Sequence, residues 1–350
     1  MKLPTVVQQL LRDPLALLSG GFIVLCALLA ALAGTIAPDN SPNANQMHLE
    51  IHSKPPGFQC FFMVADEINQ QKGGDRPIDE FFWRNDTLFY HTIGQPKTLF
   101  NVLPKVAFSA AQSTPTVSQR LFQSTTFWWG TDKFGRDLLS RMLFGARVSL
   151  AIGFVAVIIS LIIGILLGGM AGYWGGRLDQ GIQWLINVTW SIPSLLMVIA
   201  LTLALGKGFW QVFVAVGLTM WVDVARLVRG QVLALKKEDF IAAASVLGFS
   251  HFRIFLHHIF PLIVPSLIVI STANFASAIL IESGLSFLGI GVQPPMASWG
   301  GMIKDHFPYM LLGKAYMALI PGLAIMLTVL SFMLLGNRLR DLLDVRTKSR

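Results

Sequence analysis

Ser149–Ala171, with the sequence SLAIGFVAVIISLIIGILLGGMA, decides the fold class of this chain because it contains no charged residue. A helix needs about 20 predominantly apolar residues to cross roughly 30 Å of hydrocarbon. The stretch therefore predicts a transmembrane helix. Within it and just beyond it, Gly164, Gly168 and Gly172 are spaced four residues apart. That spacing lets two helix backbones approach closely in lipid and favours a tightly packed bundle.

Further apolar runs of similar length lie before and after this one. Their residue ranges are 15–37, 182–205, 209–227, 262–280 and 317–335. The first run has a competing interpretation as a signal peptide, because Ala31-Leu32-Ala33 resembles a cleavage site. Its apolar stretch is longer than a usual signal-peptide core, so we expect a membrane anchor. The chain is therefore predicted to be an all-α polytopic membrane protein with six transmembrane helices.

The composition excludes several other classes of protein. Of the 350 residues, 53% are hydrophobic and only 13% are charged, whereas a soluble domain has about 25% charged residues. A soluble, fibrous or disordered protein is therefore not expected. The net charge of +8 forms no basic stripe, so nucleic acid is not an expected partner. Cys26 and Cys60 match no disulfide framework, zinc site or redox motif.

Lysine and arginine near the span ends predict the orientation. With both termini in the cytoplasm, the inner segments carry 13 of these residues, and the short outer loops carry only Lys207, Lys304 and Lys314. The predicted organisation has four parts. Residues 1–37 form a cytoplasmic N-terminus and the first helix, and residues 38–147 form an outer loop. Residues 148–344 form a core of five helices with an inner loop at 231–261, and residues 345–350 form a cytoplasmic tail.

The outer loop contains aromatic-rich segments typical of strands rather than low-complexity sequence. These segments are residues 61–64, 81–83 and 87–90, and Arg84-Asn85-Asp86 is predicted as a hairpin turn between the last two. We therefore expect a small α+β element outside the membrane.

The inner loop is polar enough to lie outside the bilayer, and its pattern indicates two short helices. Phe240, Ala243, Ala244 and Leu247 follow i, i+3, i+4 and i+7 spacing, which predicts one apolar helix face. Gly248 is positioned to end that helix. Ser250 can cap a second helix, and Pro261 comes where the next span begins. Such a small-faced helix suits a partner's groove, although a helix lying flat on the lipid surface has the same pattern.

The segment EDFIAAASVLG at residues 238–248, followed by Arg253-Ile254 and by HIFP at 258–261, resembles the "EAA loop" of bacterial ABC-importer permeases. The dipeptide, oligopeptide and nickel branch is the most similar. Further matching pieces occur in the family's order: GTDKFGRDLLSR (130–141), GARVSL (145–150), ARLVRG (225–230), LSFLG (285–289), GVQPP (291–295), SWG (298–300) and LRD (339–341). Two departures matter. Ala242 stands where the family's loop has glutamate, and the outer loop is about 60 residues longer than usual by this comparison.

The resemblance implies a transport subunit of the inner or plasma membrane and not an enzyme. The sequence contains no G-x-x-x-x-G-K-[ST] phosphate loop, so ATP and Mg would be bound by two separate ATP-binding subunits, with no cofactor and no metal on this chain. A second homologous permease subunit and an extracytoplasmic solute-binding protein are the other implied partners. The residues implied to couple this chain to the ATPase are Phe240, Ala242, Ala243, Ala244, Leu247, Gly248, His258 and Pro261.

Polar residues inside spans are costly and are candidates for the solute pathway. The candidates are Asn187, Ser191, Asn274 and Glu282. Glu282 could meet a solute's amino group, form a salt bridge or occupy an interfacial position. For Asp223 we expect a local ion pair with Arg226, one turn away. His251, His257 and His258 lack further ligands at a metal-binding spacing.

Three functions remain in competition. The first is an ABC-importer permease for peptides, with nickel or another small solute as the alternative cargo. The second is an ATP-independent secondary transporter, which would need an internal repeat with matching broken helices, and the sequence shows no such halves. The third is a membrane-anchored interaction protein, which would leave the inner helix pair unexplained.

Overall fold

The computed structural model describes residues 9–63, 76–84, 87–96, 99–104, 122–206 and 208–343. The chain divides into two compact units. We call the first the helical unit; it comprises Met1–Leu32, Gly145–Lys304 and Leu319–Arg350. We call the second the sheet unit; it comprises Ala33–Phe144 and Asp305–Ala318.

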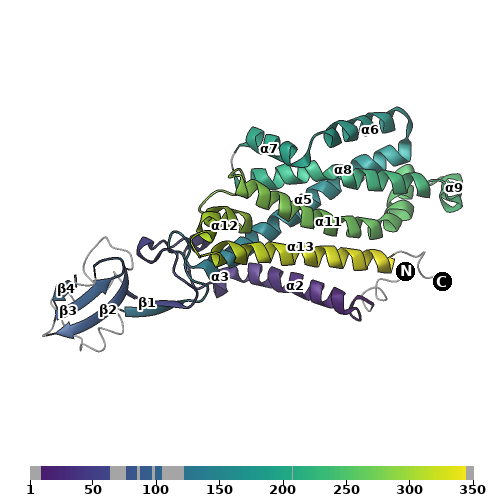
Figure 1. Ribbon diagram of the computed structural model, residues 1–350. Helices are drawn as coiled ribbons and strands as arrows, with labels where there is room; N and C mark the ends of the chain where they lie inside the picture. Colours follow the sequence, from purple (N-terminus) through teal and green to yellow (C-terminus); the bar gives the residue numbers. More distant parts are fainter. Residues whose placement is uncertain are drawn as a thin grey trace. The chain divides into compact units, whose positions relative to one another are not determined.

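The prediction of a mainly helical, multi-pass membrane protein is confirmed. Within the described residues, five helices are long and apolar enough to cross a membrane, or six if one bent pair is counted as a span. The helices are α2 (Pro14–Ala31), α3 (Ala33–Ile36), α5 (Leu138–Trp174), α6 (Gly176–Ser191), α7 (Ser194–Leu205), α8 (Phe209–Leu235), α9 (Asp239–Val246), α10 (His251–Ile254), α11 (Phe260–Phe287), α12 (Trp299–His306) and α13 (Tyr316–Leu343) (Figure 1).

The third predicted span is not one straight helix. Residues 182–205 fall on α6 and α7, and these two helices are bent by 94° relative to each other. The break lies at Ile192, which has extended backbone angles (φ −92°, ψ 126°), and at Pro193. Proline lacks an N–H and disfavours a helical conformation in the residue before it, so the helix cannot continue through this pair.

The glycines of α5 form a close seam with α8. A Cβ atom at Gly168 would lie 2.9 Å from the Ala225 Cα atom, and one at Gly172 would lie 2.9 Å from the Arg229 carbonyl oxygen. The helices can approach this closely only because these α5 positions have no side chain. Elsewhere in the helical unit, Phe275 of α11 stacks on Phe332 of α13 with ring centroids 3.9 Å apart.

One end of the helical unit gathers three chain segments. The Arg338 Nε atom near the end of α13 lies 3.2 Å from the Asp13 carboxylate, which caps the start of α2. Figure 1 shows these helix ends at the same end of the unit as α9. The start of α2, the end of α13 and the inner loop thus lie at one end of the helical unit. This arrangement requires an even number of helix crossings between the start of α2 and the end of α13.

The sheet unit contains a five-stranded antiparallel sheet with the strand order β4-β3-β2-β1-β5. Its strands are β1 (Phe58–Met63), β2 (Arg76–Arg84), β3 (Thr87–Thr92), β4 (Asn101–Pro104) and β5 (Phe122–Phe127). Arg84 pairs with Thr87 at the end of the β2–β3 ladder, where the hairpin was expected. The turn residues Asn85 and Asp86 lie outside the described residues. A sheet is therefore present, and its position outside the membrane stays a prediction.

The GTDKFGRD motif folds into a tight turn around a buried ion pair. The Asp132 carboxylate accepts hydrogen bonds from the Phe134 and Arg136 amides and lies 2.6 Å from the Arg136 Nε atom. Arg136 also donates to the Asn45 side chain at 2.9 Å. Because both charged groups are buried, neither charge is stable there without the opposite charge of the other beside it.

We expect Asp132→Ala to destabilise the sheet unit by about 3–5 kcal/mol, because it leaves the Arg136 guanidinium buried without its counter-charge. The matched control is Asp305→Ala, which removes the partly exposed Lys133–Asp305 pair; exposed pairs contribute about 0–1 kcal/mol. Thermal unfolding of the purified protein in detergent measures both variants. Equal melting temperatures for the two variants would contradict a structural role for the buried pair.

Candidate functional site

Helix α9 begins and ends as its sequence predicts. Asp239 lies in the first turn, where a negative charge complements the helix dipole. At the other end Gly248 adopts φ +77°, and its N–H donates to the Ser245 carbonyl at 3.0 Å. The Phe249 N–H then donates to the Ala244 carbonyl at 3.2 Å. Only glycine takes this left-handed conformation without steric cost, so Gly248 ends the helix sharply.

Two residues fix α9 to the helical bundle. Ile241 and Ala244 are buried in a cluster with Val228 of α8 and Ile263 of α11. This packing differs from the predicted single apolar face, because Ala244 points into the bundle and Phe240 and Leu247 do not. The helix therefore has one face held by the membrane helices and another left open.

The open face consists of Phe240, Ala243, Val246 and Leu247, all of which are exposed. Val246 is 88% exposed and Leu247 is 72% exposed. We call Phe240, Ala243, Val246 and Leu247 the α9 apolar face. Ala242, where the family has glutamate, is also exposed. An apolar surface on a polar loop marks an interaction site more often than a chance exposure.

The segment after α9 is tied to α5 and leads directly into α11. Ser250 caps α10 by accepting a hydrogen bond from the Arg253 amide, as expected. The Tyr173 hydroxyl lies 3.0 Å from the His251 Nδ1 atom. His258 packs against Phe249 with ring centroids 5.9 Å apart. Pro261 lies in the first turn of α11, where a missing N–H is tolerated.

The predicted pathway residues fall into two environments. Asn187 and Ser191 are exposed on α6, and the Ser191 hydroxyl donates to the Asn187 carbonyl at 2.7 Å. Asn274 and Glu282 are buried on α11, and Glu282 is 0% exposed. One Glu282 oxygen accepts from the Ser286 hydroxyl at 2.7 Å, and the other has no hydrogen-bond partner among the residues that the structure describes. In this conformation Glu282 therefore does not reach a solute.

A cavity of about 240 Å³ opens at the α6–α7 break, and Asp223 of α8 lines it.

The predicted Asp223–Arg226 ion pair is wrong. The Arg226 guanidinium carbon lies 3.8 Å from the ring centroid of Trp190, and Asp223 makes no ion pair with any residue that the structure describes. Arg229, one turn further along, pairs with Asp179 of α6 at 2.6 Å. The sequence alone favoured an ion pair for Asp223 over a place in a cavity, because the cavity exists only through the bend between α6 and α7.

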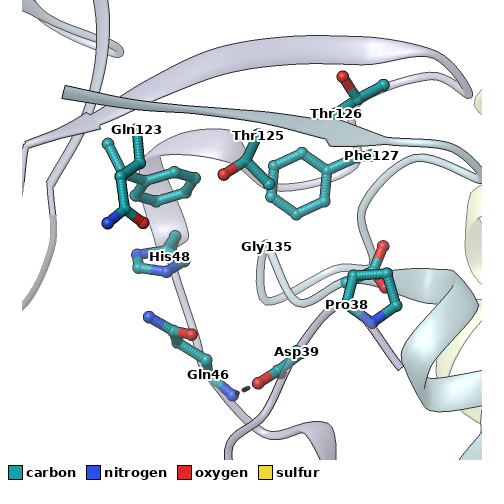
Figure 2. A pocket seen from close by; sticks show the side chains of 11 residues that line it. Pro38, Asp39, Gln46, His48, Gln123, Thr125, Thr126, Phe127 and Gly135 are labelled. Carbon is teal, nitrogen blue, oxygen red and sulfur yellow. Dashed lines mark hydrogen bonds between the residues drawn. The ribbon is translucent and has the colours of Figure 1, made fainter. Parts of the chain in front are cut away.

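The sheet unit has its own cavity, of about 170 Å³ (Figure 2). Figure 2 shows Asp39, Gln46 and His48 on one side and Gln123 and Thr125 on the other. The Asp39 carboxylate accepts from the Ser41 and Gln46 amides, so it fixes its own loop. Burial raises the pKa of the Asp137 carboxyl, although Ser140 donates hydrogen bonds to it. These two acids have turn-forming roles. Within the described residues no three His, Cys, Asp or Glu side chains are grouped to hold a metal ion.

The fold and these sites define a multi-pass membrane protein with a polar inner loop. Residues 164–349 match the family described as binding-protein-dependent transport system inner membrane component. The chain is 41% identical over 230 residues to the dipeptide transport system permease protein DppC of Bacillus subtilis, covering 66% of this chain and 72% of that protein. It is 37% identical over 276 residues to the glutathione transport system permease protein GsiD of Pectobacterium atrosepticum, covering 77% and 91% respectively.

Among solved structures, an inward-facing MetNI methionine ABC transporter is 18% identical, covers 59% of this chain and 97% of its own, and has a TM-score of 0.49. The family and the two relatives identify the chain. It belongs to the binding-protein-dependent transport system inner membrane components. It is thus a permease subunit of an ABC importer and a transport component rather than an enzyme. The family implies ATPase and binding-protein partners, and an ATP-independent transporter is not favoured.

Proposed function

We propose that this chain forms half of the translocation pathway for peptides or peptide-like solutes and receives the ATPase stroke through the α9 apolar face. A second, homologous permease subunit completes the pathway. Two ATP-binding subunits, which carry ATP and Mg, drive it from the cytoplasm, and an extracytoplasmic binding protein delivers the solute. Both termini are cytoplasmic in this arrangement. The named functions of the dipeptide and glutathione permease relatives support peptides over nickel as cargo.

The observation that carries the coupling role is the division of α9 into a held face and an open face. Ile241 and Ala244 join the same buried cluster as residues of α8 and α11, so a displacement of α9 moves those helices with it. Val246 and Leu247 remain exposed, and burying each fully in a partner's groove would contribute about 1.5–3 kcal/mol. With alanine at position 242, docking depends on shape and apolar packing rather than on an ion pair.

Cysteine crosslinking tests this docking role. We expect Ala243→Cys and Leu247→Cys to crosslink to an ATPase subunit in native membranes, with a yield that changes when nucleotide is added. The native cysteines do not interfere, because Cys26 and Cys60 are buried and burial raises the pKa of the Cys60 thiol to about 12. A thiol with so high a pKa is almost entirely protonated at neutral pH and reacts slowly.

Ala244→Cys is the matched control, because that side chain points into the bundle. It should give no crosslink under the same conditions. Absence of any protein crosslink at residues 243 and 247 would favour a helix that lies on the lipid surface and would overturn the coupling role. Uptake of a labelled dipeptide, compared with nickel, then decides the cargo class.

A further inference from the structure

Asp223 carries a charge on a membrane-crossing helix, four residues before the end of the predicted span 209–227. Helix α8 runs from Phe209 to Leu235. At about 1.5 Å per residue, Asp223 lies roughly 21 Å from the start of the helix and roughly 18 Å from its end. Aspartates within membrane spans are rare and almost always face a protein interior or a water-filled cavity. Asp223 is exposed on this chain, so its carboxylate requires either water or a polar partner beside it.

The helix break beside Asp223 independently has the same requirement. Ile192 and Pro193 interrupt the α6–α7 pair and line the same cavity as Asp223. Irregular backbone at membrane depth is tolerated only where protein buries it or where it lines a water-filled space. Both residues are exposed on this chain, so either a water-filled space or the proposed second permease subunit covers them.

The groups around this cavity include acceptors, although Trp190 and Ser194, which also line it, carry an indole N–H and a hydroxyl that can donate. The Thr189 hydroxyl already donates its proton to the Leu185 carbonyl at 2.9 Å, and the Thr219 hydroxyl donates to the Val216 carbonyl at 2.8 Å. Each oxygen therefore presents only lone pairs to the cavity. Pro193 has no N–H to offer. The Asp223 carboxylate adds a negative charge, and no cation of the described chain is paired with it.

We propose that Asp223 and the two threonine hydroxyls form a binding site for a primary ammonium group on the translocated solute. An ammonium group has three N–H donors and no acceptor, which complements a carboxylate and hydroxyl lone pairs. A carboxylate or phosphate would meet the negative charge of Asp223 and would be repelled by it. The inference rests on the proposed function for its cargo, since a peptide with a free amino terminus supplies this group. The residue that recognises the amino group is then the exposed Asp223 and not Glu282, which is buried.

Charge-selective labelling tests the site without any assumption about cargo. Ser194 lines the cavity, so Ser194→Cys places a thiol there with a one-atom change. We expect aminoethyl methanethiosulfonate to modify this thiol at least about tenfold faster than the sulfonatoethyl reagent of similar size. The preference should disappear in Ser194→Cys/Asp223→Asn and persist in Ser194→Cys/Asp223→Glu. An equal preference with and without the carboxylate would overturn the proposal.

Transport measurements in the assembled complex connect the site to its cargo. Asp223→Asn should lower the uptake of a labelled dipeptide by about tenfold or more, while ATP hydrolysis stimulated by the loaded binding protein is retained. If Asp223 instead pairs with a cation of the second permease subunit, the labelling preference is absent from the wild-type complex and Asp223→Asn fails to co-purify with that subunit. That result also overturns the proposal. Failure of the wild type to take up any dipeptide would remove the peptide assignment, and the labelling ratio would still decide the ammonium site.

Discussion

Replacing Leu247 by glutamate should reduce solute uptake by at least about tenfold and leave membrane insertion unchanged. Leu247 is exposed on the α9 apolar face and packs into no buried cluster of the described chain. The fold therefore loses nothing when it is replaced. Docking, in contrast, loses about 1.5–3 kcal/mol of apolar burial and must also bury a carboxylate without a partner. A loss of 1.4 kcal/mol already corresponds to a tenfold change in an equilibrium constant.

The measurement is uptake in whole cells, together with co-purification of the ATPase subunits. Leu247→Met is the matched control, because it keeps the side chain apolar and of similar volume, and it should transport at close to the wild-type rate. Wild-type uptake by Leu247→Glu would exclude the α9 apolar face as the contact through which the ATPase acts. Loss of uptake with the ATPase still attached would place the defect in transmission of the movement rather than in assembly.

Replacing Gly168 by leucine should prevent the bundle from assembling and should leave about a tenth or less of the wild-type protein in the membrane. A Cβ atom at this position would lie 2.9 Å from the Ala225 Cα atom and 3.0 Å from its carbonyl carbon. Backbone atoms cannot rotate away as a flexible side chain does, so α5 and α8 must separate. Overpacking of this kind costs about 1–3 kcal/mol even for small additions, and leucine adds three further carbon atoms.

Quantitative immunoblotting of membrane fractions measures this effect, and Gly168→Ala should show a lower melting temperature in detergent. Gly230→Leu is the control. It places the same side chain on α8, where a Cβ atom would have nothing within 4 Å. Wild-type amounts of Gly168→Leu in the membrane would show that the α5–α8 contact does not determine assembly.

Several structural features followed from local sequence patterns. Helix α9 ends just before Gly248, because glycine adopts φ +77° without the strain that other residues would have there. The β2–β3 pairing was expected from two aromatic-rich segments separated by Arg84-Asn85-Asp86. Pro261 lies in the first turn of α11. Each of these outcomes depends on a few consecutive residues, and for that reason the sequence could predict it.

Other features could not be predicted because they depend on groups that are distant in sequence. Arg226 was expected to pair with Asp223 on the same helix, but Trp190 of α6 offers its ring to the guanidinium instead. Glu282 stays a candidate for solute contact, and its burial on α11 was not visible in the sequence. Helical spacing could not show that Ala244 faces the bundle, since α9 could pack by any of several faces.

The sequence by itself determined the membrane class, the family and the ends of the short helices, because hydrophobic length, motif order and capping are local properties of the chain. Only the tertiary structure decided which face of α9 stays open and which intramembrane acid is exposed. The bend at Pro193 creates a cavity beside Asp223, and the packing of α11 buries Glu282. Exposure depends on which helices come together in space, and no single helix contains that information.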